Sequence, residues 1–504
     1  MNPSSFKITA APCDTEPAAS AAAETAGRPL RKLSVLMPIY NEYWTLAKIV
    51  GRVLDAPLPI ERELVAVDDC SQDGSWEILQ QLAANDSRIR IFRHEKNCGK
   101  GAAIRTAIRE MTGDVAVVQD ADLEYDPCEL PLLLEPILQG KADAVFGSRF
   151  AGHSRRVLYY WHSLGNHLLT LLSNMINDMN LTDMETCYKM IRADVLQNLR
   201  LTSNTFTLEP ELTCRLGQWG ARIYEVPISY SGRTYLEGKK IRARDALKAL
   251  GTMIHRRFID TRFTHHEGFC TLTSMARANR YNRWILDQVK PYLGQRMLEA
   301  GAGIGNLSHL LVKRQRLLLV EQESLYVSFL QQRFGQRDNV RVDAGDLSQA
   351  DHFARWQEEQ LDTVFCANVL EHVEKDDDVL RRFCDLLVPG GHCVIVVPAG
   401  QWLYTSIDAA IGHYRRYTVD LLRQRMTEAG FEVAFHKQFS RLGALGWAIS
   451  GHLLKRRNIN PRQMILLDRL LPLAKVLDHV LPVPGMSLIM VGRKPQRAAV
   501  RKAA

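Results

Sequence analysis

Short apolar runs that end in polar residues alternate with amphipathic helical repeats along this sequence, and the alternation occurs in two separate series. The first series predicts strands at residues 33–40, 63–69, 89–94, 115–122 and 143–149. The second predicts strands at residues 295–303, 316–323, 339–346, 361–368 and 392–399. Apolar strands that alternate with helices build a mainly parallel sheet covered by helices. The predicted fold class is therefore α/β, with two domains that each contain a Rossmann-like sheet.

The limits of the two domains follow from changes in composition. The chain of 504 residues is long enough for two independent hydrophobic cores. Residues 1–30 are rich in Ala, Pro, Ser and Thr, so we expect a disordered tail there. We expect the first domain over 31–245, a basic amphipathic linker helix over 246–269, the second domain over 270–495 and a basic tail over 496–504.

The net charge and the cysteine pattern indicate which partners the protein binds and in which compartment it lies. The ten cysteines form no CxxC pair and no metal-ligand spacing, which is typical of a reducing compartment, so we expect a cytoplasmic protein. No segment reaches the roughly 18 apolar residues of a membrane span, and we expect no signal peptide. The formal net charge of +8 permits nucleic acid or an anionic membrane surface as partner. The basic run at 238–258 lacks interleaved aromatic stacking residues, which argues against nucleic acid.

Acidic residues follow three of the strands predicted in the first domain. Glu42 follows the first strand, Asp69 ends the second, and Asp120, Asp122 and Glu124 alternate at the end of the fourth. Ligands of parallel sheets bind at the carboxyl ends of strands, where this many carboxylates repel one another unless a cation lies between them. Mg²⁺ and Mn²⁺ prefer such oxygen ligands and also bind phosphates. The spacing predicts a metal-diphosphate site, with solvated strand-end acids as the alternative.

Seven segments of the first domain carry a family resemblance: MPIYNE, VDDCSQDGS, NCGKGAAIRTA, QDADLEYDP, FGSR, TDMETCYKMIR and EVPISYSGRTYLEGKKI. Together they resemble a family 2 glycosyltransferase of the GT-A fold, in the polyprenyl-phosphate (dolichyl-phosphate mannose synthase-like) branch. The resemblance implies a metal-dependent, inverting transfer from a nucleotide sugar. It implies that the base and ribose are held by Pro38, Tyr40, Glu42 and Asp69, and that Mg²⁺ or Mn²⁺ on the diphosphate is held by Asp120, Asp122 and Glu124.

The same resemblance implies, as acceptor, polyprenyl phosphate or a lipid-linked or cell-surface glycan. A phosphate on the acceptor would be bound by Arg149, Arg233 and Lys240, for which solvated surface charge is the alternative. The acceptor side would be lined or supported by Asp183, Glu209 and Glu211.

Two helical segments are candidates for peripheral contact with a membrane. Residues 161–181 are apolar on one side, and residues 238–258 are amphipathic and basic. Helices of this kind either lie at an anionic membrane surface, here the inner face, or pack between domains.

The second domain opens with a glycine loop. Glu299 lies in its first strand, and Gly301, Gly303 and Gly305 follow at alternate positions. Asn306 stands where a dinucleotide-binding G-x-G-x-x-G loop would need its last glycine. The loop resembles motif I of class I S-adenosylmethionine-dependent methyltransferases, and the resemblance extends over about residues 270–495.

This second resemblance implies a role for each strand end. Glu299 would bind the amino group of the methionine moiety, and the ribose hydroxyls would be bound by Glu321, with Glu323 as the alternative. Asp346 would contact the adenine amine, and Asn368, in the segment CANVLEHVE, would belong to the same cofactor site.

A hydroxyl acceptor of the methyl group also needs a general base. His372 and His413 are the candidates, and we select His413 because IGHYRRY resembles a subgroup found in bacterial surface-glycan contexts. Arg415 or Arg416 would bind a phosphate or carboxylate on the acceptor, and a helix cap or lid is the structural alternative for this cluster.

The two resemblances together predict a bifunctional enzyme that transfers a sugar and methylates a related glycan. Two alternatives remain from other classes. In the first, the second domain only binds S-adenosylmethionine or its product and regulates the glycosyltransferase. In the second, both domains act as inert modules of a scaffold.

Overall fold

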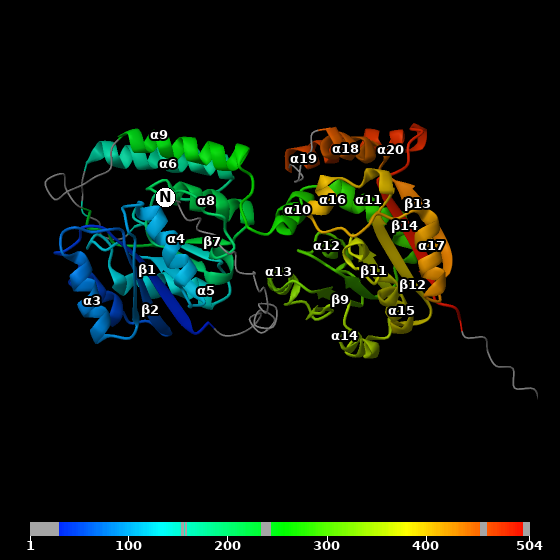
Figure 1. The fold of residues 1–504 in the computed structure, drawn as a ribbon, viewed down its shortest axis with the longest axis horizontal. Coiled ribbons are helices and arrows are strands. Elements are labelled where there is room, and N and C mark those ends of the chain that lie inside the picture. The colour runs from blue at the N-terminus through cyan, green and yellow to red at the C-terminus, as the bar shows by residue number, and fades with distance from the viewer. Residues whose placement is uncertain (1–29, 153–155, 157–158, 233–242, 454–460, 497–504) are drawn as a thin grey trace, which may run out of the picture. The chain divides into compact units, whose positions relative to one another are not determined.

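The computed structural model describes residues 30–152, 156, 159–232, 243–453 and 461–496. The chain divides into two compact units, one over Pro29–His266 and one that begins at Glu267. Each unit contains one sheet with helices packed against it (Figure 1). The predicted α/β class with two domains is confirmed. The tails expected at 1–30 and 496–504 fall almost wholly outside the described residues.

The first sheet is mainly parallel. Among the described residues its strand order is β3-β2-β1-β4-β6-β5-β7, and β6 runs antiparallel to β4 and β5. The strands are β1 (Lys32–Ile39), β2 (Glu61–Asp68), β3 (Ile89–Arg93), β4 (Val115–Val118), β5 (Ala144–Ser148), β6 (Lys189–Arg192) and β7 (Ile223–Pro227). The consecutive residues Val35, Leu36 and Met37 are all fully buried, which means that both faces of the sheet are covered.

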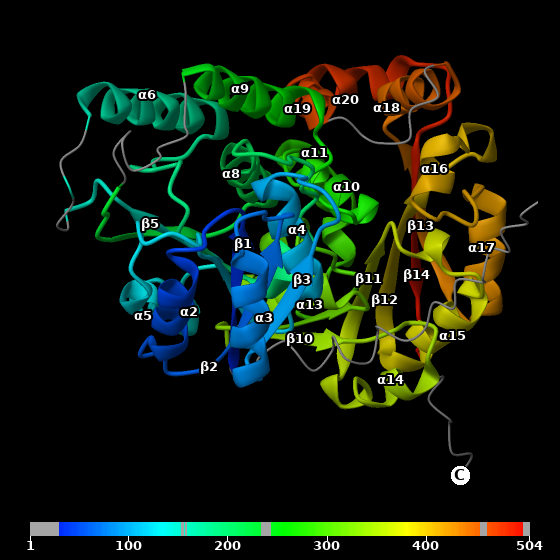
Figure 2. The same cartoon turned by 60° about the vertical axis from the view of Figure 1, so that its left-hand side comes forward.

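The helices of the first unit follow the predicted alternation at its start and then form a separate group. The helices are α2 (Leu46–Asp55), α3 (Ser75–Asn85), α4 (Lys100–Glu110), α5 (Leu130–Leu138), α6 (Tyr160–Asn177), α7 (Ala193–Leu196), α8 (Leu208–Trp219) and α9 (Ala243–Ile254). α6 and α9 lie side by side in both views (Figures 1 and 2), and both contact α8.

We expected a linker helix over 246–269, and the structure distributes this range differently. α9 and the π-helical turn His255–Ile259 that extends it lie within the first unit. Met253 of α9 is buried against Met184 and Cys214, so the apolar face of this helix is partnered inside the unit. The second unit begins at Glu267, where α10 starts.

The outward face of α6 is apolar. Its exposed large side chains are Tyr160, Trp161, Leu164, Leu168, Leu171 and Met175. Within the described residues, none of the helices combines the length and the apolar character needed to cross a membrane.

The second sheet is also mainly parallel. Among the described residues its order is β10-β9-β8-β11-β12-β14-β13, and β14 runs antiparallel to both of its neighbours. The strands are β8 (Arg296–Ala300), β9 (Arg316–Glu321), β10 (Val340–Ala344), β11 (Leu361–Ala367), β12 (Leu387–Pro398), β13 (Glu432–Phe439) and β14 (Ser487–Arg493).

Two hydrophobic clusters cover the two faces of the second sheet. Leu298 belongs to one cluster and its neighbour Met297 to the other, and Val364 and Phe365 of β11 divide in the same way. Alternation with a period of two is what a strand buried on both faces requires. The helices are α10 (Glu267–Met275), α11 (Asn279–Val289), α12 (Ser308–Leu311), α13 (Ser324–Phe334), α14 (Ala350–Ala354), α15 (Asp376–Leu386), α16 (Ser406–Ala410), α17 (Val419–Glu428), α18 (Arg441–Ala448), α19 (Pro461–Arg469) and α20 (Leu471–Val480).

Each sheet contains one point at which the strand order reverses. In the first unit the chain adds β2 and β3 on one side of β1 and then places β4 on the other side. In the second unit β8 lies in the same way between β9 and β11. Loops that leave neighbouring strands in opposite directions open a crevice at the strand carboxyl ends, where α/β proteins bind their ligands. The two crevices therefore lie beyond β1 and β4, and beyond β8 and β11.

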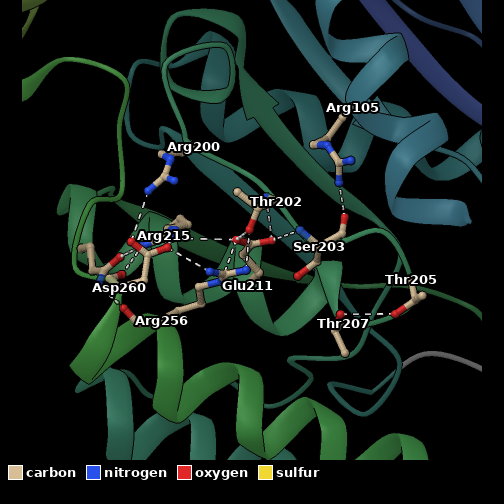
Figure 3. Close-up of polar contacts among 11 residues, drawn as sticks. Arg105, Arg200, Thr202, Ser203, Thr205, Thr207, Glu211, Arg215, Arg256 and Asp260 are labelled. Atoms are coloured by element: carbon tan, nitrogen blue, oxygen red, sulfur yellow. Dashed lines mark hydrogen bonds and ion pairs between the residues drawn. The ribbon is translucent and has the colours of Figure 1, made fainter. Parts of the chain in front are cut away.

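A buried ionic network ties α8 to the end of α9 (Figure 3). Glu211 of α8 is fully buried and accepts hydrogen bonds from the backbone N–H groups of Thr202 and Ser203 at 3.0 and 2.6 Å. Arg256 approaches Glu211 at 2.8 Å and also Asp260 at 2.9 Å. Glu211 therefore supports the structure on this side of the unit.

We expect Glu211→Gln to destabilise the first unit by about 3 kcal/mol, because it leaves the buried guanidinium groups around it with less negative charge. Calorimetry on the full chain should show a lower melting temperature for one transition. Glu77→Gln, a change at an exposed helical position, is the matched control. An unchanged melting temperature for Glu211→Gln would contradict a structural role.

Candidate functional site

The loop after β1 joins the loop after β4 at the first crevice. Pro38 lies within β1 beside Val67, Tyr40 is 40% exposed just past the strand, and Glu42 follows in the loop. The hydroxyl of Thr45 lies 2.9 Å from Glu42 Oε2 and 2.9 Å from the carbonyl oxygen of Ala121. The residues predicted for the base and ribose thus lie next to those predicted for the diphosphate.

Asp69 supports a neighbouring loop. Its carboxylate accepts hydrogen bonds from the backbone N–H groups of Cys98 and Gly99 at 2.9 and 2.7 Å. His94 Nδ1 lies 2.7 Å from the same carboxylate. The side chain is almost fully buried, so in this structure it orders the segment that leads into α4.

Asp120, Asp122 and Glu124 follow β4 at the first crevice. Lys100 Nζ contacts both oxygens of Asp120, at 2.7 and 3.0 Å, and Asp122 is only 6% exposed. Burial alone would lower the pKa of Lys100, but Asp120, Cys187 and Glu209 together outweigh it and raise this pKa well above its usual value. Tyr230 donates a hydrogen bond to Glu124 at 2.8 Å. The ligand atoms of these three residues are not among the described groups that lie within 4.8 Å of one another, and the ammonium group of Lys100 is the cation that Asp120 contacts.

The acceptor-side candidates are only in part within the described structure. Arg149 forms a bidentate ion pair with Asp183, at 2.7 and 2.8 Å, and its guanidinium lies 5.1 Å from the ring of Tyr230. Arg233 and Lys240 lie outside the described residues. Glu209 is paired with Lys189 at 2.7 Å and lies 3.9 Å from Lys100, which connects it to Asp120.

The glycine loop of the second unit closes around β8 as a cradle for a ligand. Gly301 has a φ of 67° and Gly305 a φ of 83°, a region that favours glycine. A Cβ at Gly301 would lie 2.3 Å from Val369, and one at Gly305 would lie 2.5 Å from Phe334. Gly303 donates its backbone N–H to Glu321 Oε2 at 2.7 Å.

Glu299 is a buried carboxylate with an unused oxygen. The side chain is 3% exposed, and its Oε2 has no hydrogen-bond partner among the described residues. Burial raises the pKa of Glu299 to about 8. A buried acceptor without a partner beside a glycine cradle fits the ammonium group of a methionine moiety.

The other cofactor candidates lie at the ends of the neighbouring strands. Glu321 ends β9, also accepts the backbone N–H groups of Gln322 and Glu323, and has a pKa raised by burial. Asp346 follows β10 and accepts the N–H of Ser348 at 2.8 Å. Asn368 follows β11, is exposed, and has a φ of 55°. The structure brings these side chains to one edge of the sheet.

His413 is held by a buried carboxylate. Its Nδ1 lies 2.9 Å from Asp408 Oδ1. Arg416 donates to the same oxygen at 2.8 Å, and the backbone N–H of Thr405 donates to the other oxygen at 2.9 Å. Although burial favours the neutral acid, the hydrogen bond from His413 and the charge of Arg416 lower the pKa of Asp408 to about 2. Asp408 is therefore a carboxylate that orients the His413 ring.

We expected Arg415 or Arg416 to bind the acceptor, but both side chains form ion pairs with buried carboxylates of the second unit. Arg416 is 3% exposed and bound to Asp408, as described above. Arg415 pairs with Asp376 at 3.0 Å and donates to the carbonyl oxygen of Glu374 at 2.9 Å. Both side chains support the loop that carries His413, because each neutralises a buried carboxylate.

Sequence reasoning missed three residues of these sites. Lys100 lies in a segment that carried the resemblance, but no role was assigned to it. Glu371 adjoins the candidate His372, and Asp408 lies five residues before His413. A sequence shows that such residues are near each other along the chain, but not that their side chains meet.

Comparisons with known proteins confirm both resemblances. The model of glycosyl transferase family 2 matches residues 34–200, and that of a methyltransferase domain matches residues 298–393. The undecaprenyl-phosphate mannosyltransferase of Micrococcus luteus is 32% identical over 217 residues, which are 41% of this chain and 87% of that protein. The dolichol-phosphate mannosyltransferase of Pyrococcus furiosus is 29% identical over 217 residues, which are 42% of this chain and 60% of that protein.

A solved structure of a methyltransferase is also similar to part of the chain. The S-adenosylmethionine dependent methyltransferase from Mesorhizobium loti is covered over 98% of its length and covers 42% of this chain, at 16% identity and a TM-score of 0.31. By contrast, the chain spans less than two thirds of the length of the Pyrococcus furiosus relative.

Glu299 makes the stability of the second unit depend on pH. Its pKa of about 8 in the folded chain lies above the value of about 4.3 in an unfolded chain, so between these values the folded state binds more protons. Stability is therefore lost as pH rises through this range and is constant above it. Glu299→Gln should remove a slope of up to about 1.4 kcal/mol per pH unit.

Chemical denaturation of ligand-free protein at several pH values between about 5 and 8 measures this slope for both proteins. Glu323→Gln, at an exposed position near the same strand end, is the control. Equal slopes in Glu299→Gln and the unchanged protein would show that Glu299 is already ionised when it is buried.

Proposed function

Because the chain belongs to glycosyl transferase family 2 and carries a methyltransferase domain, we propose that it is a bifunctional enzyme. It transfers a sugar from a nucleotide sugar to polyprenyl phosphate and methylates a related glycan from S-adenosylmethionine. The observation that carries the proposal is that each sheet places the acidic residues of its resemblance after the strands beside its own reversal point, and that Glu299 in the second unit keeps an oxygen without a hydrogen-bond partner among the described residues.

The names of the two mannosyltransferases support polyprenyl phosphate as the acceptor. Mg²⁺ or Mn²⁺ held by Asp120, Asp122 and Glu124 would neutralise the diphosphate of the donor as it leaves. Lys100 keeps Asp120 in place, and Pro38, Tyr40, Glu42 and Asp69 shape the pocket for base and ribose. The transfer inverts the sugar carbon, because the acceptor phosphate attacks from the side opposite the diphosphate.

Arg149 faces the acceptor in this proposal. Its pairing with Asp183 fixes the guanidinium plane, which suits it to an anionic oxygen. Arg233 and Lys240 join it from the part of the chain outside the described residues. The exposed apolar face of α6 supports contact with the membrane surface in which a polyprenyl chain lies.

In the second unit Glu299 binds the methionine ammonium, Glu321 the ribose hydroxyls and Asp346 the adenine amine, with Asn368 beside them. S-adenosylmethionine supplies a methyl group that is bonded to a sulfonium sulfur. After the transfer the rest of the molecule leaves as a neutral thioether. His413, with Nδ1 turned to Asp408, presents Nε2 to the acceptor side and activates the acceptor hydroxyl.

Asp122→Asn should abolish sugar transfer, because it removes a carboxylate that would hold the metal ion on the leaving diphosphate. We expect kcat/KM to fall at least about a hundredfold, as for the loss of other groups that stabilise developing charge. The assay mixes full-length protein, Mn²⁺ or Mg²⁺, a panel of nucleotide sugars and polyprenyl phosphate, and scores sugar in the lipid phase.

The matched control is Asp178→Asn, at an exposed position with a φ of 56° that asparagine tolerates. Metal-dependent binding of a nucleotide sugar without transfer to lipid would overturn the lipid-phosphate acceptor. It would favour a saccharide acceptor and remove the phosphate roles of Arg149, Arg233 and Lys240.

His413→Ala should lose methylation of the lipid-linked sugar while it keeps S-adenosylmethionine binding, because His413 lies on the acceptor side of the site. Calorimetric titration of the methyl donor and transfer of a labelled methyl group measure the two properties. His436→Ala, an exposed histidine of the same unit, is the control. Binding by the unchanged protein without any methyl transfer would establish the regulatory alternative.

A further inference from the structure

Three side chains of the second unit converge beyond β11. Glu371 and His372 come from the 3₁₀ turn Leu370–His372, and His413 comes from the loop after α16. One ligand atom from each lies within 4.8 Å of the other two. The backbone N–H of Tyr414 donates to the carbonyl oxygen of Glu371 at 2.8 Å, so the turn and the loop are fixed to each other.

Glu371 is a buried carboxylate that no described residue satisfies. It is 1% exposed, and neither of its oxygens accepts a hydrogen bond within the described residues. Its Oε1 lies 3.8 Å from His413 Nε2, which is longer than a hydrogen bond. Arg416, the cation of this cluster, is turned to Asp408 and to the carbonyl oxygen of Ala399. A buried carboxylate without a partner is costly unless a ligand completes it.

His413 offers one ring nitrogen toward Glu371. Its Nδ1–H donates a hydrogen bond to Asp408, which leaves the lone pair of Nε2 on the side of Glu371. The rings of His372 and His413 are 4.7 Å apart, and His372 is exposed, so the cluster opens to solvent on its side. A carboxylate that orients the far nitrogen of a histidine is the usual support of a metal ligand.

A second group of similar composition shows the contrast. Asp69, His94 and Cys98 also lie close enough to share an ion. There the carboxylate already accepts two backbone N–H groups and contacts the histidine. Glu371 has no such partners, and this difference selects the cluster in the second unit.

We propose that Glu371, His372 and His413 bind a divalent first-row transition ion whose open positions take hydroxyl oxygens of the methyl acceptor. Two imidazoles and one carboxylate suit Mn²⁺, Co²⁺ or Zn²⁺. Ligands at about 2.1 Å from one tetrahedral ion lie about 3.4 Å apart, so Glu371 Oε1 and His413 Nε2, which are 3.8 Å apart, would have to approach by a few tenths of an ångström to share one ion.

The inference rests on the proposed methyltransferase function and changes the role of His413, which would activate the hydroxyl as a ligand of the ion and not as the base itself. A hydroxyl bound to the ion releases its proton to water more readily than a free hydroxyl does. The alkoxide oxygen then forms a bond to the methyl carbon while the carbon–sulfur bond breaks, and S-adenosylhomocysteine leaves as a neutral thioether. Adjacent hydroxyls on one sugar ring can occupy two open positions, so the substrate class is a sugar with a vicinal diol.

Metal binding is measured apart from activity. Full-length Asp122→Asn protein is dialysed against a chelator and titrated with Mn²⁺, Co²⁺ and Zn²⁺ by calorimetry, and visible absorption follows Co²⁺. We expect one ion fewer per chain in Asp122→Asn/Glu371→Gln, or an affinity at least about tenfold weaker. Asp122→Asn/Glu374→Gln, altered at an exposed residue three positions further on, should match Asp122→Asn. His372→Ala should weaken binding in the same way and change the Co²⁺ spectrum.

Binding of S-adenosylmethionine by each variant reports that the unit is folded. Equal stoichiometry and affinity in the Glu371→Gln and Glu374→Gln proteins would overturn the metal site. Methylation that persists at full rate after removal of metal would also overturn it and leave the proposed function intact. Metal bound through Glu371 without methylation of any lipid-linked sugar would retain the site and overturn the proposed function.

Discussion

The position of both candidate sites depends on one constraint, which is that neighbouring parallel strands end at the same edge of a sheet. Where the strand order reverses, the loops diverge and leave the strand ends open. In the first unit this happens between β1 and β4, and in the second between β8 and β11. The acidic residues that follow these strands must therefore face one another, although they are tens of residues apart in the sequence.

The buried carboxylates of the described residues are compensated in different ways. Glu211 is neutralised by Arg256 and backbone donors, and Asp69 by backbone donors and His94. Asp120 forms an ion pair with the ammonium group of Lys100. Glu299 and Glu371 each keep an unsatisfied oxygen among the described residues. Burial raises the pKa of both carboxyl groups to about 8, so a cation bound at either position would displace a proton.

Local pattern predicted the architecture and the strand-end residues but not the partners of the charged groups. Alternating apolar runs placed the strands, and a glycine spacing placed the cradle around Gly301 because a bulkier residue would meet Val369. The antiparallel direction of β6 and β14 left no local signal, since it is set by long connections. Arg416 matched an acceptor-binding pattern in the sequence, yet its guanidinium satisfies Asp408. Such choices depend on contacts between distant segments, which a single sequence does not display.

The acidic residues of the two crevices differ in whether a positively charged side chain already contacts them. This difference decides how much each crevice gains when it binds a cation. In the first unit Lys100 already neutralises Asp120, one of the three acids that would bind a divalent ion. The Lys100–Asp120 contact orders the loop after β4 without that ion. Burial raises the pKa of Glu371 to about 8, so an ion bound in the second unit would displace the proton of this carboxyl group. Binding there is coupled to the order of the Leu370–His372 turn and of the His413 loop, which the backbone bond of Tyr414 joins. An acceptor hydroxyl that coordinates the ion is thereby placed on the side of the strand end from which Glu299 and Glu321 would hold the methyl donor.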